Sequence, residues 1–339
     1  MPDEIGEAAD LRRIENYLAA RIVTAYDKVQ VSGGEDEANS FSIPSASLFA
    51  AGPIGKHYGA YLEFDREQEG TVDLIGSLSG VWGNESRYVG LRVGQGHMLF
   101  AGGGVAGFDR PTAISTPLTY QESLTSTIPL QLAGDQVGVE AFAVFAGRLR
   151  TSVQLLNGLV LGAGEEGAAV SRRDVALTSQ LMWDDVGSGV GVAAYAGNAL
   201  GLVVADPTAA KRYYRIAATA NKIVDRYEVM GGYAIGRDTD VPTGDPLAPV
   251  IRSPSGSSYW LQGQYTTQRQ ALTLFARYEF LDQDRDAADA SRTRSVVGAV
   301  LPMNSPEYFR WSVELFSDSF AASAAPGRVG LSTRLQVAF

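Results

Sequence analysis

Few side chains in this sequence could act as nucleophiles or bind a metal. Cysteine is absent, and the only histidines are His57 and His97. The absence of cysteine excludes disulfides, thiolate metal sites and a C-x-x-C-H haem attachment. Two histidines are too few for a multi-histidine metal site. Both histidines are expected at a turn or a strand end, where a serine hydrolase would also need a nearby nucleophile. We predict that the chain is not an enzyme and holds no cofactor.

Acidic residues gather in short runs between apolar segments, such as 33–40 (GGEDEANS) and 281–291 (LDQDRDAADAS). The second run lacks the glycine and the distal glutamate of a calcium-binding loop, so only loose Ca²⁺ binding at these acidic loops is expected. The net charge of −10 disfavours nucleic acid as a partner, because a phosphate backbone is bound by clustered Lys and Arg.

Arginines and carboxylates also occur inside the apolar segments, where they alternate with apolar residues. At the C-terminus, Arg334 and Gln336 alternate with Leu335 and Val337 in a segment that ends at Phe339. A period of two is typical of a β-strand with one apolar and one polar face. The same alternation recurs in segments 58–67, 258–267, 271–280 and 308–316.

Sixteen strands are expected along the chain, although residues 4–20 could instead begin as a short helix. No segment reaches the roughly 18–20 consecutive apolar residues of a membrane helix. A chain that crosses a membrane with strands must close them into a barrel, because lipid cannot pair with an open sheet edge. The strands are predicted at about 16–30, 42–51, 58–67, 71–82, 86–96, 136–146, 148–160, 174–183, 189–197, 212–221, 225–236, 257–267, 270–281, 292–301, 308–317 and 328–339.

The connections between these strands alternate in length. Those after even-numbered strands are short and those after odd-numbered strands are usually long, with 67–70 (EQEG) as the exception. Outer-membrane barrels have short turns at one rim and long loops at the other. Outward aromatics such as Trp82, Phe145 and Trp183 then collect at the short-turn rim, although they could also be core residues of a soluble β-protein. We predict one all-β domain over 1–339, a transmembrane antiparallel β-barrel of about sixteen strands.

The N-terminal residues lack the basic and apolar regions of a signal peptide. This would fit a cytoplasmic protein. The strand pattern favours a mature chain in the bacterial outer membrane, from which the signal peptide is absent and replaced by Met1.

Taken together, the strand count, the terminal Phe339 and the long third loop at 97–135 resemble the general porins of Gram-negative bacteria. The resemblance implies a water-filled channel for passive diffusion of small hydrophilic solutes and ions, surrounded by outer-membrane lipid and lipopolysaccharide. It also implies a homotrimer, and a third loop that folds into the lumen and constricts the pore. Small outward residues, Ala60, Gly76 and Gly80, would permit close contact between barrels.

Two other functions stay open at this point. One is a substrate-selective channel of the same fold. The other is a structural barrel that partners a periplasmic or outer-membrane redox complex, since 47–65 (SLFAAGPIGKHYGAYLEFD) and 102–112 (GGGVAGFDRPT) resemble porins found alongside multihaem cytochromes.

The alternation places many charges on the lumen side, because a charge facing lipid at mid-depth costs roughly 2–4 kcal/mol. The inward set is Arg21, Arg92, Arg150, Arg215, Arg277, Arg294, Arg310 and Arg334, with Glu63, Asp65, Glu140, Glu228, Glu279 and Glu314. In porins, acids on the third loop face a basic wall. The resemblance therefore implies a pore constriction with Arg21, Arg294, Arg310 and Arg334 on the wall and Asp109 and Glu122 on the loop. Alternatively, these charges form ion pairs that only brace the wall.

Overall fold

The chain folds into one large sheet that closes on itself. The computed structural model describes residues 18–32, 36–67, 72–95, 115, 117–118, 137–157, 159–160, 174–200, 211–239, 241–243, 250–268, 272–302, 309–321 and 326–338. The strands are β1 (Leu18–Val31), β2 (Asp36–Pro53), β3 (Tyr58–Glu67), β4 (Val72–Asn84), β5 (Arg87–Gln95), β6 (Val137–Phe145), β7 (Leu149–Leu156), β8 (Leu159–Val160), β9 (Asp174–Met182), β10 (Gly189–Leu200), β11 (Lys211–Val224), β12 (Tyr227–Asp238), β13 (Val241–Thr243), β14 (Val250–Arg252), β15 (Ser255–Thr266), β16 (Thr273–Asp282), β17 (Ser291–Pro302), β18 (Phe309–Phe320) and β19 (Arg328–Ala338).

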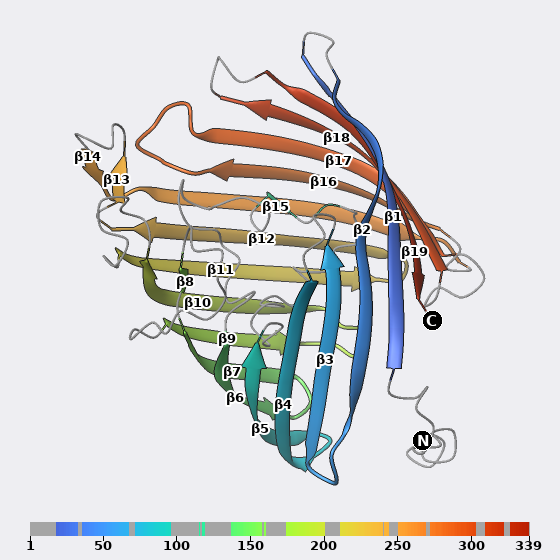
Figure 1. The fold of residues 1–339 in the computed structure, drawn as a ribbon, viewed down its shortest axis with the longest axis vertical. Helices are drawn as coiled ribbons and strands as arrows, with labels where there is room; N and C mark the ends of the chain where they lie inside the picture. The colour runs from blue at the N-terminus through green and yellow to red at the C-terminus, as the bar shows by residue number, and fades with distance from the viewer. Residues whose placement is uncertain are drawn as a thin grey trace.

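Sixteen of these strands form the wall of a closed antiparallel barrel, as predicted. Each wall strand pairs with the next, and β1 pairs with β19 to complete the ring, from Arg21 opposite Ala338 to Val31 opposite Arg328. Figure 1 shows β1 lying beside β19. In the described part of the chain, no helix is long and apolar enough to span a membrane.

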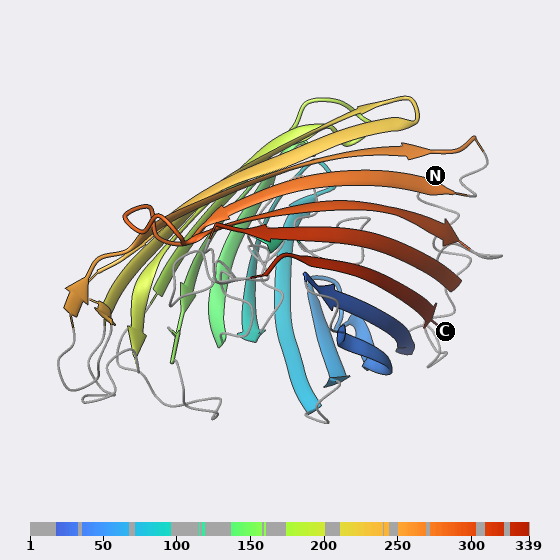
Figure 2. The ribbon, with the colours of Figure 1, turned by 90° about the horizontal axis from the view of Figure 1, so that it is seen from above.

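Three short strands lie outside this ring. β13 and β14 form a separate hairpin that projects beyond the ends of β12 and β15 (Figure 2). β8 pairs with the end of β10 in parallel, so the predicted strand 148–160 is two strands. The sequence pattern did not indicate these strands, because two or three residues are too few to show a period of two.

Several wall strands are also longer than predicted. β2 begins at Asp36, six residues before its predicted start, and pairs with β1 across an irregularity near Ser42–Ser45. Its first residues are acidic and do not alternate, so only the pairing with β1 reveals them. β12 and β18 continue to Asp238 and Phe320, which places two further aspartates on the inner wall.

The two faces of the wall differ in polarity. Outward side chains are apolar and exposed, as shown by Leu78 at 61% and Leu261 at 58% exposure. Inward side chains include polar groups with no exposure, such as Glu140 and Gln154. In a water-soluble β-protein the apolar face would be the buried one, so this arrangement is that of a barrel whose exterior faces lipid.

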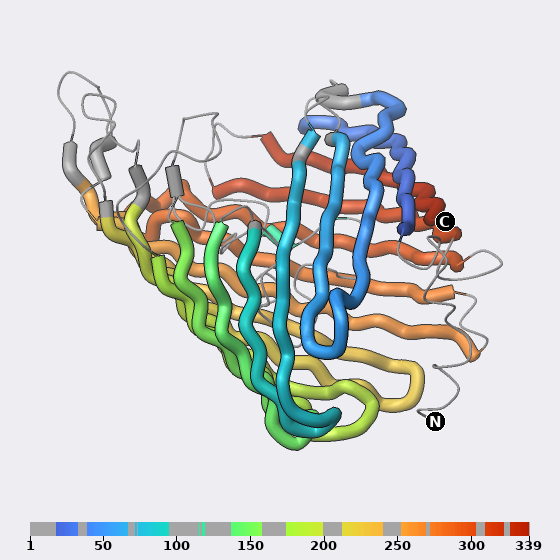
Figure 3. Tube along the Cα trace, turned by 60° about the horizontal axis from the view of Figure 1, so that its bottom comes forward, coloured from blue at the N-terminus to red at the C-terminus, as the bar shows by residue number. Residues whose placement is uncertain are grey.

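Figure 3 shows the short turns gathered at one rim of the barrel, where hydrogen bonds and ion pairs connect several of them. The turn after β6 has positive φ at Ala146 and Gly147, and it is closed by a hydrogen bond at 3.0 Å from the Arg148 N–H to the Phe145 carbonyl. Its Gly147 N–H donates to the Ser86 carbonyl at 2.8 Å, and its Arg148 binds Asp185 of the next turn at 2.7 Å. These contacts fix neighbouring hairpins to each other.

Asp184 makes a similar link farther along the rim. Its carboxylate accepts from the Ser188 N–H at 2.7 Å and binds the Lys222 ammonium at 2.9 Å. The hydrogen bonding from Ser188, reinforced by Lys222, holds the pKa of Asp184 well below its ordinary value. The link is therefore present at neutral pH and weakens only as the pH falls below the ordinary aspartate pKa of about 3.9.

Glycines on the wall make room for large side chains on neighbouring strands. The Phe142 ring on β6 lies directly over Gly90 of β5, and a Cβ added at Gly90 would come within 2.2 Å of it. In contrast, a Cβ added at Gly263 on the outer face of β15 would meet nothing within 4 Å.

Gly90→Ala should lower the temperature at which the folded, SDS-resistant form is lost, because Phe142 must move. Overpacking of this kind costs about 1–3 kcal/mol. Gly263→Ala is the matched control and should leave the transition temperature unchanged. The measurement is the heat-dependent shift of electrophoretic mobility. Equal transition temperatures for the two variants would contradict the packing described for Gly90.

Candidate functional site: the inner wall of the barrel

The inner wall carries charges of both signs. Register and burial place all eight predicted arginines and all six predicted acids on the lumen side. They also add residues that the sequence analysis missed, namely Arg292, Arg328, Asp27, Asp174, Asp238 and Asp318. The predicted set has eight arginines and six acids, and the additions are two arginines and four acids. Among the described side chains, the excess of arginine over acid on the inner wall is therefore wrong.

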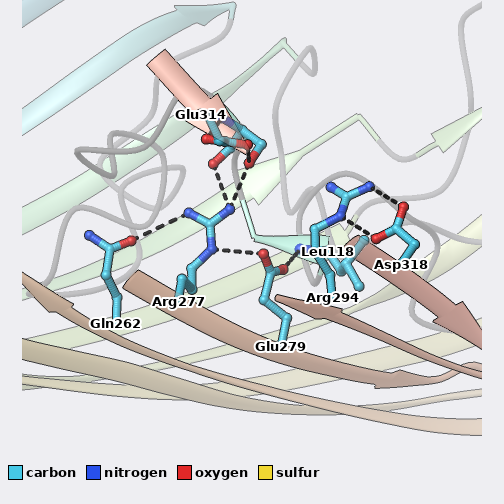
Figure 4. Close-up of polar contacts among 8 residues, drawn as sticks. Leu118, Gln262, Arg277, Glu279, Arg294, Glu314 and Asp318 are labelled. Atoms are coloured by element: carbon cyan, nitrogen blue, oxygen red, sulfur yellow. Dashed lines mark hydrogen bonds and ion pairs between the residues drawn. The ribbon is translucent and has the colours of Figure 1, made fainter. Parts of the chain in front are cut away.

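Part of the long third loop binds this wall. The Arg277 guanidinium on β16 donates at 2.8 Å to both the carbonyl and the hydroxyl oxygen of Ser115. The same guanidinium binds Glu279 at 2.7 Å and approaches Gln262 at 3.4 Å (Figure 4). The described loop residues 115 and 117–118 thus lie inside the barrel against β16.

Two wall carboxylates hold the loop backbone as well. Glu314 on β18 accepts from the Ser115 N–H at 3.1 Å and from its hydroxyl. Glu279 accepts from the Leu118 N–H, and Leu118 has no exposure. Hydrogen bonds from backbone N–H groups replace part of the hydration that a carboxylate loses on burial. Glu279 and Glu314 therefore anchor this part of the loop.

Two of the four arginines predicted for a basic wall are engaged with aspartates. Arg294 binds Asp318 at 2.7 Å and stacks on the Phe316 ring at 5.1 Å. Arg334 binds Asp27 on the neighbouring β1 at 2.9 Å. An adjacent carboxylate cancels most of the field of an arginine at a distance. Both pairs support the alternative reading in which the charges brace the wall.

The charges of the other two arginines are less fully compensated by nearby carboxylates. Arg21 donates to Ser47 at 2.9 Å and lies 4.0 Å from Glu63. Arg310 donates to the Gln336 side chain at 3.2 Å, makes no ion pair with any described residue, and lies within electrostatic reach of Arg21. The predicted loop partners, Asp109 and Glu122, lie outside the described residues.

The opposite side of the wall has a separate buried network. Asp174 accepts from the hydroxyls of Tyr195 at 2.7 Å and Tyr213 at 2.8 Å. Two residues beyond Tyr213 on β11, Arg215 binds Asp238 at 2.7 Å, and neither side chain is exposed. Removing one member of such a pair would leave a buried charge uncompensated, so this network stabilises β9 to β12.

No group of three or more histidines, cysteines or carboxylates that could hold a metal occurs among the residues that the structure describes. Loose Ca²⁺ binding at the acidic loops stays a prediction, since 33–35 are outside the described residues.

Comparison with known proteins identifies the fold. No family model matches the chain, and no curated protein matches it. The anion-selective porin from Comamonas acidovorans is 11% identical with a TM-score of 0.67, and the match covers 95% of this chain and 98% of that one. The outer membrane channel DcaP of Acinetobacter baumannii is 12% identical with a TM-score of 0.63, covering 95% and 96%.

A third solved structure, the trimer form of OmpT, an outer membrane protein of Vibrio cholerae, is 13% identical with a TM-score of 0.63, covering 94% of this chain and 98% of that one. The class that this architecture defines is the closed outer-membrane β-barrel. Within that class, the fold of this chain is the porin fold.

The position of the loop against β18 can be tested with paired cysteines, because the chain has none of its own. In the double variant Ser115→Cys/Glu314→Cys, a short bifunctional thiol reagent should join the two residues. Ser115→Cys/Glu228→Cys is the control, because Glu228 lies four wall strands away from β18. Mass analysis of proteolytic fragments detects the link. Equal crosslinking of both pairs would contradict the position of Ser115.

Proposed function

We propose that the chain is an outer-membrane channel for passive diffusion of small hydrophilic solutes and ions. The observation that carries this proposal is the polarity of the closed wall, which is apolar outside and charged inside. Sixteen-stranded barrels leave an aqueous channel, whereas smaller ones are filled by their own side chains. A channel for water and solutes needs a polar lining, whereas a barrel with a purely structural role does not. The shared fold with porins and channels supports the same conclusion.

The third loop is proposed to narrow this channel. Its described residues contact β16 and β18 through Arg277, Glu279 and Glu314, so the loop is held within the cross-section of the barrel. A narrow passage with charged walls acts strongly on a passing ion, whereas charges at an open rim are screened within about 8 Å at physiological salt.

Ion preference is proposed to depend on the less compensated arginines. Arg294 and Arg334 are paired with aspartates, so they contribute little field. Arg21 and Arg310 lie on neighbouring rungs near the junction of β1, β18 and β19 and favour anions there. The result would be a weak anion preference at high salt. At low salt the acidic loops should shift the preference toward cations.

A homotrimer is proposed as the assembly, supported by the shared fold with the trimeric OmpT. The small outward glycines of β4 do not leave the open surface that was expected for close contact with another barrel. The space over Gly76 is filled by Leu62, and the space over Gly80 by Trp82 and Tyr58 of the same chain. The proposed contact is instead Phe41 on β2, which is 85% exposed on the outer face.

Recordings from planar lipid bilayers test the channel and its assembly. The wild-type protein should produce stable open channels, because the lumen is water-filled. If three barrels insert together, each insertion should close in three equal steps. A protein that inserts without conducting would contradict the channel, and single-step closure would contradict the trimer alone.

Reversal potentials across a KCl gradient test the origin of ion preference. Arg310→Ala should reduce the anion preference at high salt, because this guanidinium lacks a described carboxylate partner. The double variant Asp27→Asn/Arg334→Gln is the control, because it removes a paired arginine together with its carboxylate and leaves the net charge of the wall unchanged, so the preference should stay close to that of the wild type. Equal shifts toward cations in the two variants would show that ion pairing does not decide which arginines act.

A further inference from the structure

Basic and aromatic side chains lie together on the lumen side of the wall, at the short-turn end of β18, β19 and β1 to β3. Phe49 of β2 lies two residues along its strand from the partner of Arg21 on β1. Tyr61 of β3 is diagonal to Phe49, and the two ring centroids are 6.5 Å apart. Arg310 of β18 lies across β19 from Val23, two residues beyond Arg21. Arg21, Phe49, Tyr61 and Arg310 thus form a basic–aromatic corner.

Arg21 is held in one orientation by its neighbours. Its guanidinium carbon lies 5.4 Å from the centre of the Phe49 ring, and its Nη2 donates to the hydroxyls of Ser47 at 2.9 Å and Ser45 at 3.3 Å. A planar guanidinium that stacks on a ring is preorganised, so a solute need not order it on binding. All its polar contacts with described residues use Nη2, which leaves the donors of Nη1 for a solute.

The arginines of this corner are exposed in the lumen, whereas the nearest carboxylate lies behind them. The side chain of Arg21 is 33% exposed and that of Glu63, which is 4.0 Å away, is 6% exposed. Glu63 also accepts a hydrogen bond from the Tyr61 hydroxyl. Arg310 is exposed, donates to Gln336 and makes no ion pair with any described residue. A solute therefore meets two cationic groups before it meets the carboxylate.

An aromatic carboxylate matches both kinds of side chain in the corner. A carboxylate accepts paired hydrogen bonds from a guanidinium, and a planar ring stacks on guanidinium groups and on other rings. An inorganic anion or a saturated acid would use only the charge, and both arginines would repel a cationic solute. Adjacent strands are about 4.8 Å apart, so one small aromatic acid can contact the guanidinium on β1 and a ring on the next strands at the same time.

We propose that the basic–aromatic corner is a binding site for aromatic carboxylates. The carboxylate binds Arg21 and Arg310, and the ring packs against Tyr61 and Phe49. The inference rests on the proposed channel and adds the class of solute that binds in its lumen. Arginines alone would attract any anion, whereas the rings distinguish an aromatic acid from a saturated acid of the same charge and similar size.

Fluorine NMR of the detergent-solubilised protein, titrated with 4-fluorobenzoate, tests the proposal. Arg21→Gln and Arg310→Gln should each raise the dissociation constant about tenfold, because each removes a charge-assisted hydrogen bond. Phe49→Leu should raise it about threefold through loss of the stacked ring. In competition against 4-fluorobenzoate, cyclohexanecarboxylate should bind the wild type about threefold more weakly than benzoate, and the two acids should bind Phe49→Leu equally.

Phe64 on β3 provides a matched control. Its ring is on the outer face of the same part of the wall and is 44% exposed. Phe64→Leu removes the same group as Phe49→Leu from the other side of the sheet, so it should leave the dissociation constant unchanged. Retained SDS resistance confirms that each variant is folded.

Three outcomes would overturn the proposal. They are equal wild-type affinities for benzoate and cyclohexanecarboxylate, an unchanged dissociation constant in both arginine variants, and an equal loss in Phe49→Leu and Phe64→Leu. Bilayer conductance in KCl separates this proposal from the channel itself. A barrel that binds 4-fluorobenzoate in the expected pattern without conducting would remove only the proposed transport, and a conducting barrel that does not distinguish the two acids would remove only the binding site.

Discussion

Closure of the sheet between β1 and β19 is the constraint on which the rest of the structure depends. In lipid, an unpaired backbone N–H or C=O costs several kcal/mol, so an open edge cannot be tolerated. The register from Arg21–Ala338 to Val31–Arg328 removes both edges at once. Once the ring is closed, each strand must present one face to lipid and one to the lumen. The period of two in the sequence follows directly from that requirement.

The lumen face then has to keep many charges ionised in a confined space. It does so by pairing arginines with carboxylates on adjacent strands, as in Arg294–Asp318 and Arg215–Asp238, and by using Glu279 and Glu314 to bind the third loop. The loop contacts serve two purposes. They satisfy wall charges that would otherwise be costly to bury, and they hold chain within the cross-section of the barrel. In the proposed channel, the less compensated charges, chiefly Arg310, would be the ones that act on a passing ion.

The sequence was sufficient for the strand order, the two faces and the segregation of loop length, because all three depend on local alternation and spacing. It was insufficient wherever the partner strand decides the outcome. Asp238 and Asp318 lie beyond the predicted strand ends, in residues that stay paired because the neighbouring strands continue. The glycines of β4 looked like a contact face for another barrel, and only the positions of Leu62 and Trp82 reveal that they are filled. Likewise, no local signal pairs Ser115 with Glu314, almost two hundred residues apart along the chain.

The most direct test of this account is the single-channel conductance of Glu279→Ala/Glu314→Ala beside that of Glu228→Ala. Glu228 also faces the lumen, but it binds Asn221 and Gln264 rather than any described residue of the third loop. Removing the two anchors should free the loop from β16 and β18 and change the conductance, which increases if the loop leaves the lumen. The conductance of Glu228→Ala should stay close to that of the wild type. Wild-type conductance in the double variant, with the barrel still SDS-resistant, would contradict the claim that these wall carboxylates hold the loop where it limits flow.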